Sequence, residues 1–554
     1  MTIKIVRRND WHTLLLIAAI LSAIALKVAL LMADVIQMNA DEAIVALMAR
    51  HILKGARPIF FYGQAYMGSL DALLVALGFR FFGEHVAVIR GLQVLLYVMT
   101  IITTYMLGKE VYRSSAVGVL AAWFLAIPTV NMTLYTTVSL GGYGEAILLG
   151  NLILMLTIWI MNSIKEKKRY FLSLFLFFWG VLCGFGFWVF GMTLVYSIPS
   201  FVYLGYYLVR NARKQQEDSI KFIEFIRLLM VIVVGVMLGS LPWFFYAFQY
   251  GFQSLVSELG GSAIASVENI PWIKNFFMHI INFLLFGIPV IIGLRPPWGT
   301  SWLAMPLLPL AMIFWSFVVV YTFGRLRFSI KNRDALMLLL GVCATLIAGF
   351  IMTPFGADPS GRYFLPIGII ISLMGASAIH SMQARWQRWA WGVFGIILVY
   401  NLWGTIQCAR VYPPGITTQF DAITQINHDF DKDLIDFLLS EGERTGYTNY
   451  WVAYPLAFHS CEQLIFVPRL PYHQDFRYTD RDNRYKEYEA IVNASPKVAY
   501  ITTNHPQLNQ YLRNKFTELG IHWKEKYIGD YQIFYALSSA IRPQQLGLSL
   551  NQDK

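Results

Sequence analysis

The residues best suited to chemistry in the first part of the chain are two adjacent carboxylates, Asp41 and Glu42. They follow the first long apolar run and precede an amphipathic helical pattern over residues 43–53. Asp41 could act as a general base on an acceptor hydroxyl, with Glu42 as its neighbour or as a substrate contact. Asp41 could equally be the N-cap or a first-turn acid of this helix, because a carboxylate at a helix N-terminus meets unpaired N–H groups and the positive dipole end. The catalytic and the structural role are compatible, and the spacing alone favours the structural one.

Basic and aromatic side chains follow these carboxylates directly. Lys54 and Arg57 lie at the end of the helical pattern, and Tyr62, Gln64 and Tyr66 lie in the aromatic turn after it. Charge, aromatic rings and a loop are thus gathered where an otherwise apolar chain first leaves the bilayer. A membrane protein rarely keeps such a segment without a use for it, so we expect a substrate-binding loop.

A second candidate site lies late in the chain, where a Gly/Pro-rich loop over residues 353–361 leads into Arg362 and Tyr363. The planar guanidinium of Arg is well suited to holding a phosphate, and a helix N-terminus adds a favourable dipole. An interfacial Arg and Tyr that only anchor a helix end would give the same pattern. Both interpretations stay open on these residues alone.

A third candidate is Glu145, which follows the glycine-rich stretch 139–144 and opens a long apolar run. An ionisable group just inside the apolar zone is costly, which favours a functional role. A helix N-terminal acid at the interface is the alternative. The four cysteines show no metal-ligand spacing, so neither a zinc site nor a disulfide framework is indicated.

The composition limits the class of protein that must position these residues. Of the 554 residues, 56% are hydrophobic and only 14% are charged, whereas a soluble chain carries about a quarter charged residues. Apolar runs of about 18 or more residues recur along most of the length, which predicts a multi-span α-helical membrane protein. The net charge of +11 comes from Lys and Arg in short loops between these runs. This is the positive-inside pattern, so nucleic acid is not an expected partner.

The apolar runs predict about ten full spans and two further embedded helices, or about 10–13 membrane helices in all. Residues 11–32 follow basic residues and show no cleavage site, which predicts an uncleaved anchor with a cytoplasmic N-terminus. Residues 34–70 then lie outside. We expect residues 70–82 to form a juxtamembrane helix and residues 276–294 a re-entrant or interfacial pair, because basic loops would otherwise fall outside. The remaining spans are expected at residues 86–107, 116–133, 144–161, 171–190, 192–208, 222–245, 302–321, 336–352, 364–379 and 389–408, with a polar external loop at residues 247–275.

Residues 1–409 are thus expected to form a transmembrane catalytic domain, and from residue 410 the composition turns polar and mixed in charge. Strand and helix patterns alternate there, which predicts a small external α/β domain over residues 410–541. Its aromatic segment 448–454 is interpreted as a strand whose rings pack in a core, although such rings could also stack on sugars. We expect residues 542–554 to be a disordered tail.

Together these features resemble the GT-C glycosyltransferases, specifically the group of protein O-mannosyltransferases and lipid A aminoarabinose transferases. The resemblance covers about residues 1–408. The residues that carry it are Asp41-Glu42-Ala43, Leu53-x-Gly55-x-x-Pro58, Phe82-Gly83 ahead of Arg90, and Arg362-Tyr363-Phe364-Leu365-Pro366.

The resemblance implies inverting transfer of a sugar from a polyprenyl-phosphate donor to an acceptor hydroxyl on the outer face of the plasma (inner) membrane. Asp41 matches the catalytic acidic position, Arg362 and Tyr363 match the region that contacts the phosphate, and Glu145 falls where the group often has an acid. Gln64 stands where relatives carry a phosphate-binding Lys. Aminoarabinose transfer is therefore not expected, and Arg362 would take over the phosphate charge, with Lys54 or Arg57 as further candidates.

The partners and alternatives follow from this assignment. We expect a lipid bilayer, a polyprenyl-phosphate sugar and an acceptor that is a glycan, a glycolipid or a protein. A carboxylate-rich site could hold Mg²⁺ or Mn²⁺, but no ligand set is complete in the sequence. The main alternative is a transporter or flippase for an amphipathic lipid-linked substrate, which would place ionisable groups near the bilayer midplane. A second alternative is a non-catalytic receptor whose soluble domain binds glycan.

Overall fold

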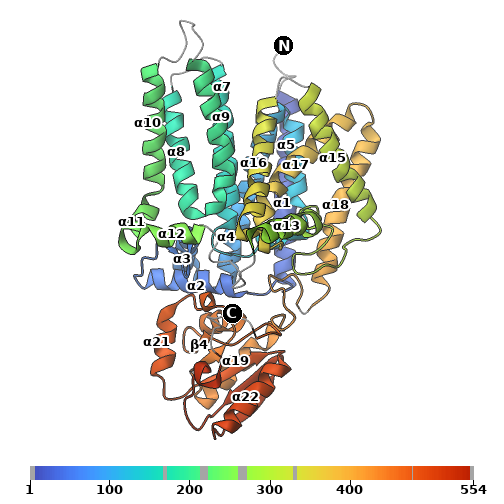
Figure 1. Cartoon of the computed structure of the whole chain (residues 1–554). Helices are drawn as coiled ribbons and strands as arrows, with labels where there is room; N and C mark the ends of the chain where they lie inside the picture. The colour runs from blue at the N-terminus through green and yellow to red at the C-terminus, as the bar shows by residue number, and fades with distance from the viewer. Residues whose placement is uncertain are drawn as a thin grey trace.

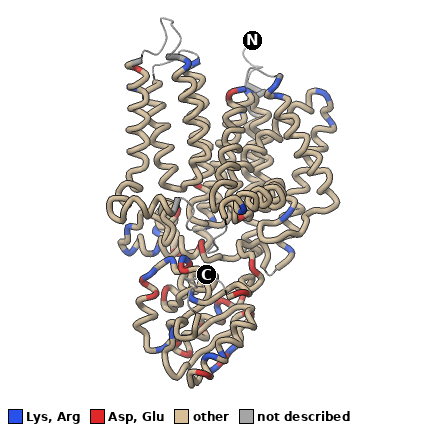
Figure 2. The backbone as a smooth tube through the Cα atoms, viewed as in Figure 1, with Lys and Arg blue, Asp and Glu red and all other residues tan. Residues whose placement is uncertain are grey.

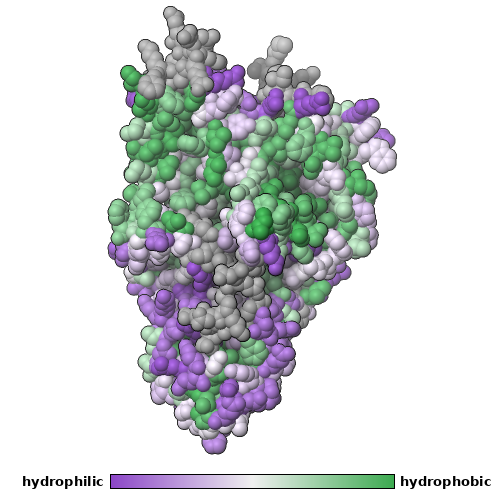
Figure 3. All heavy atoms as spheres, in the orientation of Figure 1, coloured by the Kyte–Doolittle hydropathy of each residue, from purple (hydrophilic) through white to green (hydrophobic). Residues whose placement is uncertain are grey.

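The computed structural model describes residues 6–165, 171–212, 222–259, 271–328, 333–412, 414–476 and 478–548. A bundle of long helices lies on one side and a small α/β domain on the other, and the N-terminus is at the bundle end far from that domain (Figure 1). Hydrophobic side chains cover the visible face of the bundle, whereas the C-terminal domain is largely polar (Figure 3). The predicted fold class, a multi-span helical protein with a soluble α/β domain, is confirmed.

The helices of the membrane part are α1 (Val6–Met32), α2 (Ala40–Leu53), α3 (Leu70–Phe82), α4 (Val86–Tyr112), α5 (Ser115–Ala126), α6 (Val130–Tyr135), α7 (Tyr143–Lys165), α8 (Leu172–Val189), α9 (Leu194–Ala212), α10 (Phe222–Gly239), α11 (Leu241–Tyr250), α12 (Phe252–Leu259), α13 (Trp272–Asn282), α14 (Ile288–Ile291), α15 (Leu308–Phe328), α16 (Arg333–Met352), α17 (Leu365–Gln383) and α18 (Gln387–Ala409). Among the described residues, ten helices are long and apolar enough to cross a membrane, or eleven if the bent pair α10–α11 counts as one span.

Two segments are predicted not to cross the membrane. The α3 helix has only 13 residues and lies with α2 between the bundle and the C-terminal domain (Figure 1). The segment that contains α13, the π-helical turn η2 (Phe283–Gly287) and α14 is one of the ten helices long and apolar enough to cross, so its re-entrant or interfacial placement stays a prediction. Asn282 Nδ2, in its middle, donates to Gly356 O at 2.9 Å, and Arg295 Nη2, just after it, donates to Pro359 O at 2.6 Å. The second half of the segment therefore packs along the loop after α16.

Glycine spacing explains the tightest helix pair in the bundle, α8 with α10. Gly180 and Gly184 of α8 face Gly235 and Gly239 of α10, and a Cβ on Gly184 would lie 2.1 Å from the Val236 carbonyl oxygen. Small residues four apart let two backbones touch, which is how helices associate without a hydrophobic driving force in lipid.

Prolines shorten or bend two of the predicted spans. The span expected at residues 116–133 ends at Ala126, because Ile127 precedes Pro128 and leaves the helical region. The span expected at residues 222–245 bends by 62° between α10 and α11, where Pro242 opens the second helix. The polar loop expected at residues 247–275 is wrong over residues 252–259, which form α12; residues 260–270 lie outside the described part.

Three short segments of the membrane part matter for the site. They are the hairpin β1 (Phe60–Phe61) and β2 (Gln64–Gly68), the turn η1 (Gly191–Thr193) before α9, and the turns η3 (Pro354–Ala357) and η4 (Arg362–Phe364) between α16 and α17. All of them lie at the bundle end that faces the C-terminal domain.

The described C-terminal domain holds a five-stranded sheet with the order β4-β3-β5-β7-β6. The β3 strand pairs in parallel with β4 and β5, and β7 pairs antiparallel with β5 and β6. Its elements are α19 (Asp431–Glu441), β3 (Thr445–Thr448), α20 (Tyr450–His459), β4 (Ile465–Pro468), α21 (Lys486–Ala494), β5 (Ala499–Thr503), α22 (Pro506–Glu518), β6 (Lys524–Ile528) and β7 (Tyr531–Tyr535), with turns η5 (His428–Phe430), η6 (Asp480–Asp482) and η7 (Pro543–Leu546).

Two expectations for this domain need correction. The strand predicted at residues 448–453 is wrong, because Asn449 caps a helix there: its Oδ1 accepts from Trp451 N at 3.0 Å, and α20 follows. The tail predicted from residue 542 is ordered over η7, where Pro543 and Leu546 are buried. Residues 549–554 lie outside the described part.

Candidate functional site

The first candidate residue, Asp41, lies in the first turn of α2 but does not cap it. Asn39 is the N-cap, and its Oδ1 accepts from Glu42 N at 2.9 Å. The Asp41 carboxylate instead faces the C-terminal domain, where Tyr450 Oη donates to its Oδ1 at 2.5 Å. Asp41 is therefore a first-turn acid of α2, one of the two structural roles that the sequence allows, and not its N-cap.

Glu42 is fully buried in an ion pair with Arg90 of α4. Arg90 Nε and Nη2 donate to the two Glu42 oxygens at 3.1 and 3.0 Å, and Arg90 Nη1 donates to Ile36 O at 2.6 Å. Both carboxylate oxygens are thus engaged by one guanidinium. This pair fixes the start of α2 against α4 and thereby positions its neighbour Asp41.

The C-terminal domain contributes a second charged side chain beside Asp41. The guanidinium of Arg484 lies 5.5 Å from the centre of the Tyr450 ring and interacts electrostatically with Asp41. With the Gln64 amide turned so that its oxygen faces Arg484, that oxygen accepts from both Arg484 Nη atoms at 2.6 and 2.7 Å. Burial raises the pKa of Tyr450 well above its usual value, and the Asp41 carboxylate adds to this. Tyr450 therefore stays protonated and holds Asp41 as a donor.

A second group of residues surrounds Arg362 at η4. Arg362 Nη2 pairs with Asp358 Oδ2 at 2.6 Å, and its guanidinium lies 5.0 Å from the centre of the Tyr363 ring. Tyr143 and Tyr66 also interact with it electrostatically. Within the described residues Arg362 Nε and Tyr363 Oη are buried and make no hydrogen bond. Two donors therefore remain for a ligand.

The β2 strand contacts residues of both groups. The ring of Tyr66 lies 6.0 Å from the ring of Phe355, which lies 5.2 Å from the ring of Tyr363. Gln64, two residues earlier on the same strand, accepts from Arg484. The strand thus connects the group around Arg362 with the group around Asp41, although the two are far apart in the sequence.

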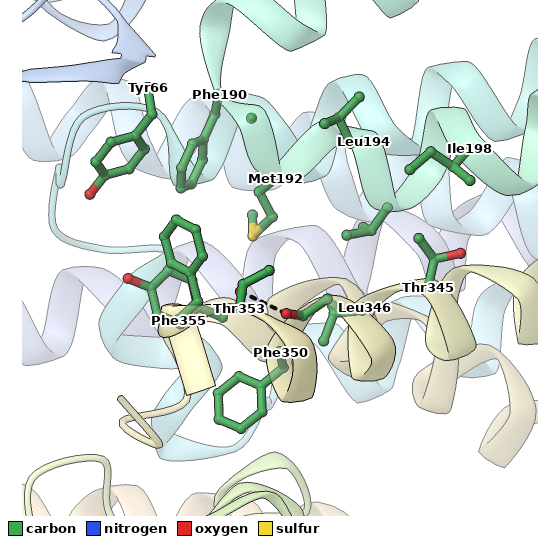
Figure 4. A pocket seen from close by; sticks show the side chains of 14 residues that line it. Tyr66, Phe190, Met192, Leu194, Ile198, Thr345, Leu346, Phe350, Thr353 and Phe355 are labelled. Atoms are coloured by element: carbon green, nitrogen blue, oxygen red, sulfur yellow. Dashed lines mark hydrogen bonds between the residues drawn. The ribbon is translucent and has the colours of Figure 1, made fainter. Parts of the chain in front are cut away.

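An apolar groove between α9 and α16 ends at this site. Its volume is about 260 Å³, and part of it is open to the outside. Ile198, on its outer part, is 47% exposed, so the groove opens toward the lipid-facing surface of the bundle. Figure 4 shows Tyr66 and Phe190 opposite Phe355 at one end, with Leu194, Ile198 and Thr345 farther along. The lining residues are Tyr66, Phe190, Gly191, Met192, Leu194, Val195, Ile198, Thr345, Leu346, Gly349, Phe350, Thr353, Phe355 and Tyr363.

Lys54 and Tyr62 lie away from Asp41, at the other end of α2. Helix geometry separates Asp41 and Lys54 by about 20 Å along the axis. Lys54 Nζ donates to Glu462 Oε2 at 3.1 Å, and Tyr62 stacks on Tyr485 with ring centres 4.8 Å apart. Both contacts dock α2 and the hairpin on the C-terminal domain. Arg57 is exposed beside the hairpin.

Glu462 is the main acidic partner in this docking contact. Burial would raise its pKa, but hydrogen bonds from His51, Lys54 and Tyr488 outweigh it and lower the pKa of Glu462 to about 2. Glu462 is therefore ionised at neutral pH, and the docking contact carries a full negative charge opposite the basic end of α2.

Glu145 lies in a buried carboxylate pair with Asp71 of α3. Asp71 accepts from Gln93 Nε2 at 3.1 Å and from Ser139 Oγ at 2.5 Å. Burial raises the pKa of Asp71 to about 6. Glu145 is 2% exposed, so it lies beneath the site rather than on its surface.

The residues that the sequence did not single out come from the C-terminal domain. Tyr450 and Arg484 lie more than 400 positions after Asp41, and nothing in their local pattern marks them. No group of three or more His, Cys, Asp or Glu in the described ranges is arranged to hold a metal ion. The expected Mg²⁺ or Mn²⁺ site is thus not assigned to any residues.

Comparisons with known proteins identify solved structures with a similar architecture. No family model matches the chain, and no curated protein matches its sequence. ArnT from Cupriavidus metallidurans in the apo state aligns with a TM-score of 0.60 and 10% identity over 95% of this chain and 98% of that one. The same protein bound to undecaprenyl phosphate aligns with a TM-score of 0.54 and 12% identity, again over 95% of this chain and 98% of that one. The apo oligosaccharyltransferase from Archaeoglobus fulgidus aligns with a TM-score of 0.53 and 13% identity over 89% of this chain and 69% of that one. ArnT and the oligosaccharyltransferase are both GT-C superfamily members, so the chain has the GT-C fold that the sequence resemblance predicts.

Proposed function

We propose that the protein is a glycosyltransferase that moves a sugar from a polyprenyl-phosphate donor to an acceptor hydroxyl at the outer face of the membrane. One observation carries this proposal: the apolar groove ends at Tyr66 and Tyr363, where Arg362 lies over the Tyr363 ring, and Gln64 on the strand of Tyr66 accepts from Arg484, which lies over the Tyr450 ring beside Asp41. A lipid tail, a phosphate and a reacting hydroxyl would each find a suitable environment along this line.

The groove and Arg362 suit the two parts of the donor. Apolar side chains of α9 and α16 would hold the polyprenyl chain, and the groove opens toward lipid, from which such a chain would enter. Arg362 and Tyr363 offer unpaired donors to the phosphate. ArnT shares this fold and has been crystallised with undecaprenyl phosphate, which supports a donor of this chemical class.

The arrangement supports direct displacement with inversion. Asp41 would take the proton of the acceptor hydroxyl while the acceptor oxygen bonds to the anomeric carbon. The bond from that carbon to the phosphate oxygen breaks, and the polyprenyl phosphate leaves with the electron pair. Arg362 would stabilise the negative charge that develops on the phosphate. Tyr450 and the Glu42–Arg90 pair position Asp41 for this step.

We further propose that the N-terminus is cytoplasmic and the C-terminal domain external, in a plasma (inner) membrane. Lys and Arg gather at the bundle end away from the C-terminal domain, among them Lys165 and Arg210 (Figure 2). Basic residues at one end of a bundle indicate its cytoplasmic side. The site at the opposite end then lies outside.

The test is an assay of the full-length protein in detergent with a panel of polyprenyl-phosphate sugars, scored by the release of polyprenyl phosphate. Arg362→Gln should raise the donor KM about tenfold or more, because a charge-assisted contact to the phosphate is lost. Arg385→Gln, exposed at the far end of α17, is the control. An unchanged donor KM in a folded Arg362→Gln protein would remove Arg362 from the phosphate site.

A transporter of lipid-linked sugar is the second candidate, and it shares the groove. It would bind the donor and move it between the leaflets of liposomes without releasing polyprenyl phosphate. Release that depends on the protein separates the two functions.

A further inference from the structure

A second cleft opens beside the site, separate from the apolar groove. It lies between the β1–β2 hairpin, the α11–α12 pair and residues 480–486 of the C-terminal domain, and its volume is about 650 Å³. Pockets for small ligands usually hold about 300–1,000 Å³. This cleft therefore has room for more than one sugar ring.

The charge of this cleft is positive. Arg57 and Lys486 line it, both are exposed, and neither forms an ion pair with a described residue. Asp480, the single acidic side chain among its lining residues, is paired with Arg469. The wall thus carries cationic charge that no neighbour compensates.

Tyrosine rings provide the rest of the wall. Tyr246 and Tyr250 lie with ring centres 4.5 Å apart, and Tyr250 is 59% exposed. Tyr62 lines the opposite side, where its stacking on Tyr485 fixes its ring. Aromatic faces of this kind pack against the apolar faces of sugars, while their hydroxyls reach polar groups.

The cleft leads to the candidate base. Gln64 lines the cleft, and its amide accepts from Arg484. Arg484 lies over the Tyr450 ring, and Tyr450 holds Asp41. Gln64 is thus the residue of the cleft wall from which a series of contacts runs to Asp41.

A polar cleft on the other flank of α2 has the opposite charge. Its lining includes four aspartates, Asp34, Asp429, Asp431 and Asp436. That cleft would repel an anion, so the two entrances differ in the ligands they admit.

We propose that the basic cleft binds the acceptor, and that the acceptor is an anionic saccharide with a phosphate or carboxylate group. That the bound molecule is an acceptor rests on the proposed function. That the cleft binds an anionic saccharide does not. Arg57 and Lys486 hold the anionic group, the tyrosines hold the sugar faces, and the reacting hydroxyl faces Asp41.

The experiment measures binding of three probes to the full-length protein in amphipol by calorimetry. They are octyl glucoside 6-phosphate, octyl glucuronide and neutral octyl glucoside. The two anionic probes should bind wild type about tenfold more tightly than the neutral one at low salt. The double variant Arg57→Gln/Lys486→Gln should reduce this preference to less than about threefold. The control Lys524→Gln/Lys526→Gln removes two exposed charges from β6 and should leave it unchanged.

Three results would overturn the proposal. The first is that wild type binds the neutral and the anionic probes equally. The second is that the β6 control, Lys524→Gln/Lys526→Gln, loses the preference for anionic probes together with Arg57→Gln/Lys486→Gln. The third is displacement of octyl glucoside 6-phosphate by equimolar dihexanoyl phosphatidylglycerol, which would make the cleft a site for anionic lipid headgroups.

Failure of the cleft and failure of the proposed function are distinguishable. If wild type releases polyprenyl phosphate but binds neutral and anionic probes equally, the anionic-saccharide site fails and the proposed function stands. If wild type releases nothing but keeps its anionic preference, the proposed function fails and the anionic-saccharide site stands.

Discussion

The contact between Asp41 and Tyr450, a hydrogen bond of 2.5 Å, is one of those that link the membrane part to the C-terminal domain. Tyr450 is 4% exposed and protonated, so it is a fixed donor rather than a mobile side chain. A carboxylate that is held in this way keeps one oxygen toward the donor and leaves the other for a substrate proton. The tyrosine thus acts through Asp41, as a positioning residue.

Tyr450→Phe should lower kcat about tenfold and leave the donor KM unchanged, because it removes one hydrogen bond that orients Asp41. Tyr535→Phe on β7 is the control, since its ring packs on Phe437 away from the site. Both kinetic constants and the melting temperature are measured for each variant. An equal loss of kcat in both variants would mean that Tyr450 serves only the packing of the domain.

At this scale the sequence predicted part of the site. Asp41 and Arg362 were identifiable because each stands at the end of an apolar run, next to residue types that bind substrates. Tyr450 and Arg484 were not, since their role depends on how a separate domain docks. Tyr450 also follows Asn449, and the aromatic segment there was interpreted as a strand of a core.

The groove is a property of two helices, α9 and α16, that stay slightly apart near their ends. Gly349 of α16 lines it, and a Cβ there would meet nothing within 4 Å. The absence of a side chain at this position keeps the groove open. A larger residue would fill the space without displacing a neighbour.

Gly349→Leu should therefore weaken binding of polyprenyl phosphate about tenfold or more while the protein stays folded, because its side chain occupies the groove. Gly392→Leu on α18 is the matched control, as a Cβ there also meets nothing within 4 Å. Binding is measured by displacement of a fluorescent polyprenyl phosphate. Equal affinity in both variants would show that the lipid chain lies elsewhere.

The sequence predicted most elements because apolar length alone identifies a membrane helix. It missed the break after Ala126 and the bend between α10 and α11, where prolines interrupt continuous apolar runs. It also missed α12, whose exposed Phe252 and Val256 lie on one side of a mostly polar segment. Parity of the basic loops, rather than hydropathy, predicts that the segment with α13 returns to the same side, whereas its length and apolar character would let it cross.

The whole molecule places its candidate site between two bodies, the helix bundle and the C-terminal domain. The α2 helix lies between them (Figure 1). It contacts the bundle through Glu42 and Arg90, and the C-terminal domain through Asp41 and Tyr450. A site at such a junction can receive a lipid from the membrane on one side and a polar molecule from solvent on the other.

The proposed orientation predicts which cysteine reacts from outside. Cys461 on the C-terminal domain is exposed, whereas Cys183 and Cys408 are buried in the bundle. A membrane-impermeant maleimide should label the protein in right-side-out vesicles, and Cys461→Ser should abolish the label. Labelling only after the vesicles are permeabilised would reverse the orientation and place the site in the cytoplasm.

The most direct test of the central claim is the rate of polyprenyl phosphate release by Asp41→Asn, measured together with donor binding. Asp433→Asn is the matched control, because Asp433 is also a first-turn acid, on α19. The account predicts that Asp41→Asn releases product at least about a hundredfold more slowly, with donor affinity within about threefold of wild type. A release rate equal to that of Asp433→Asn would contradict it and reduce Asp41 to a structural acid of α2.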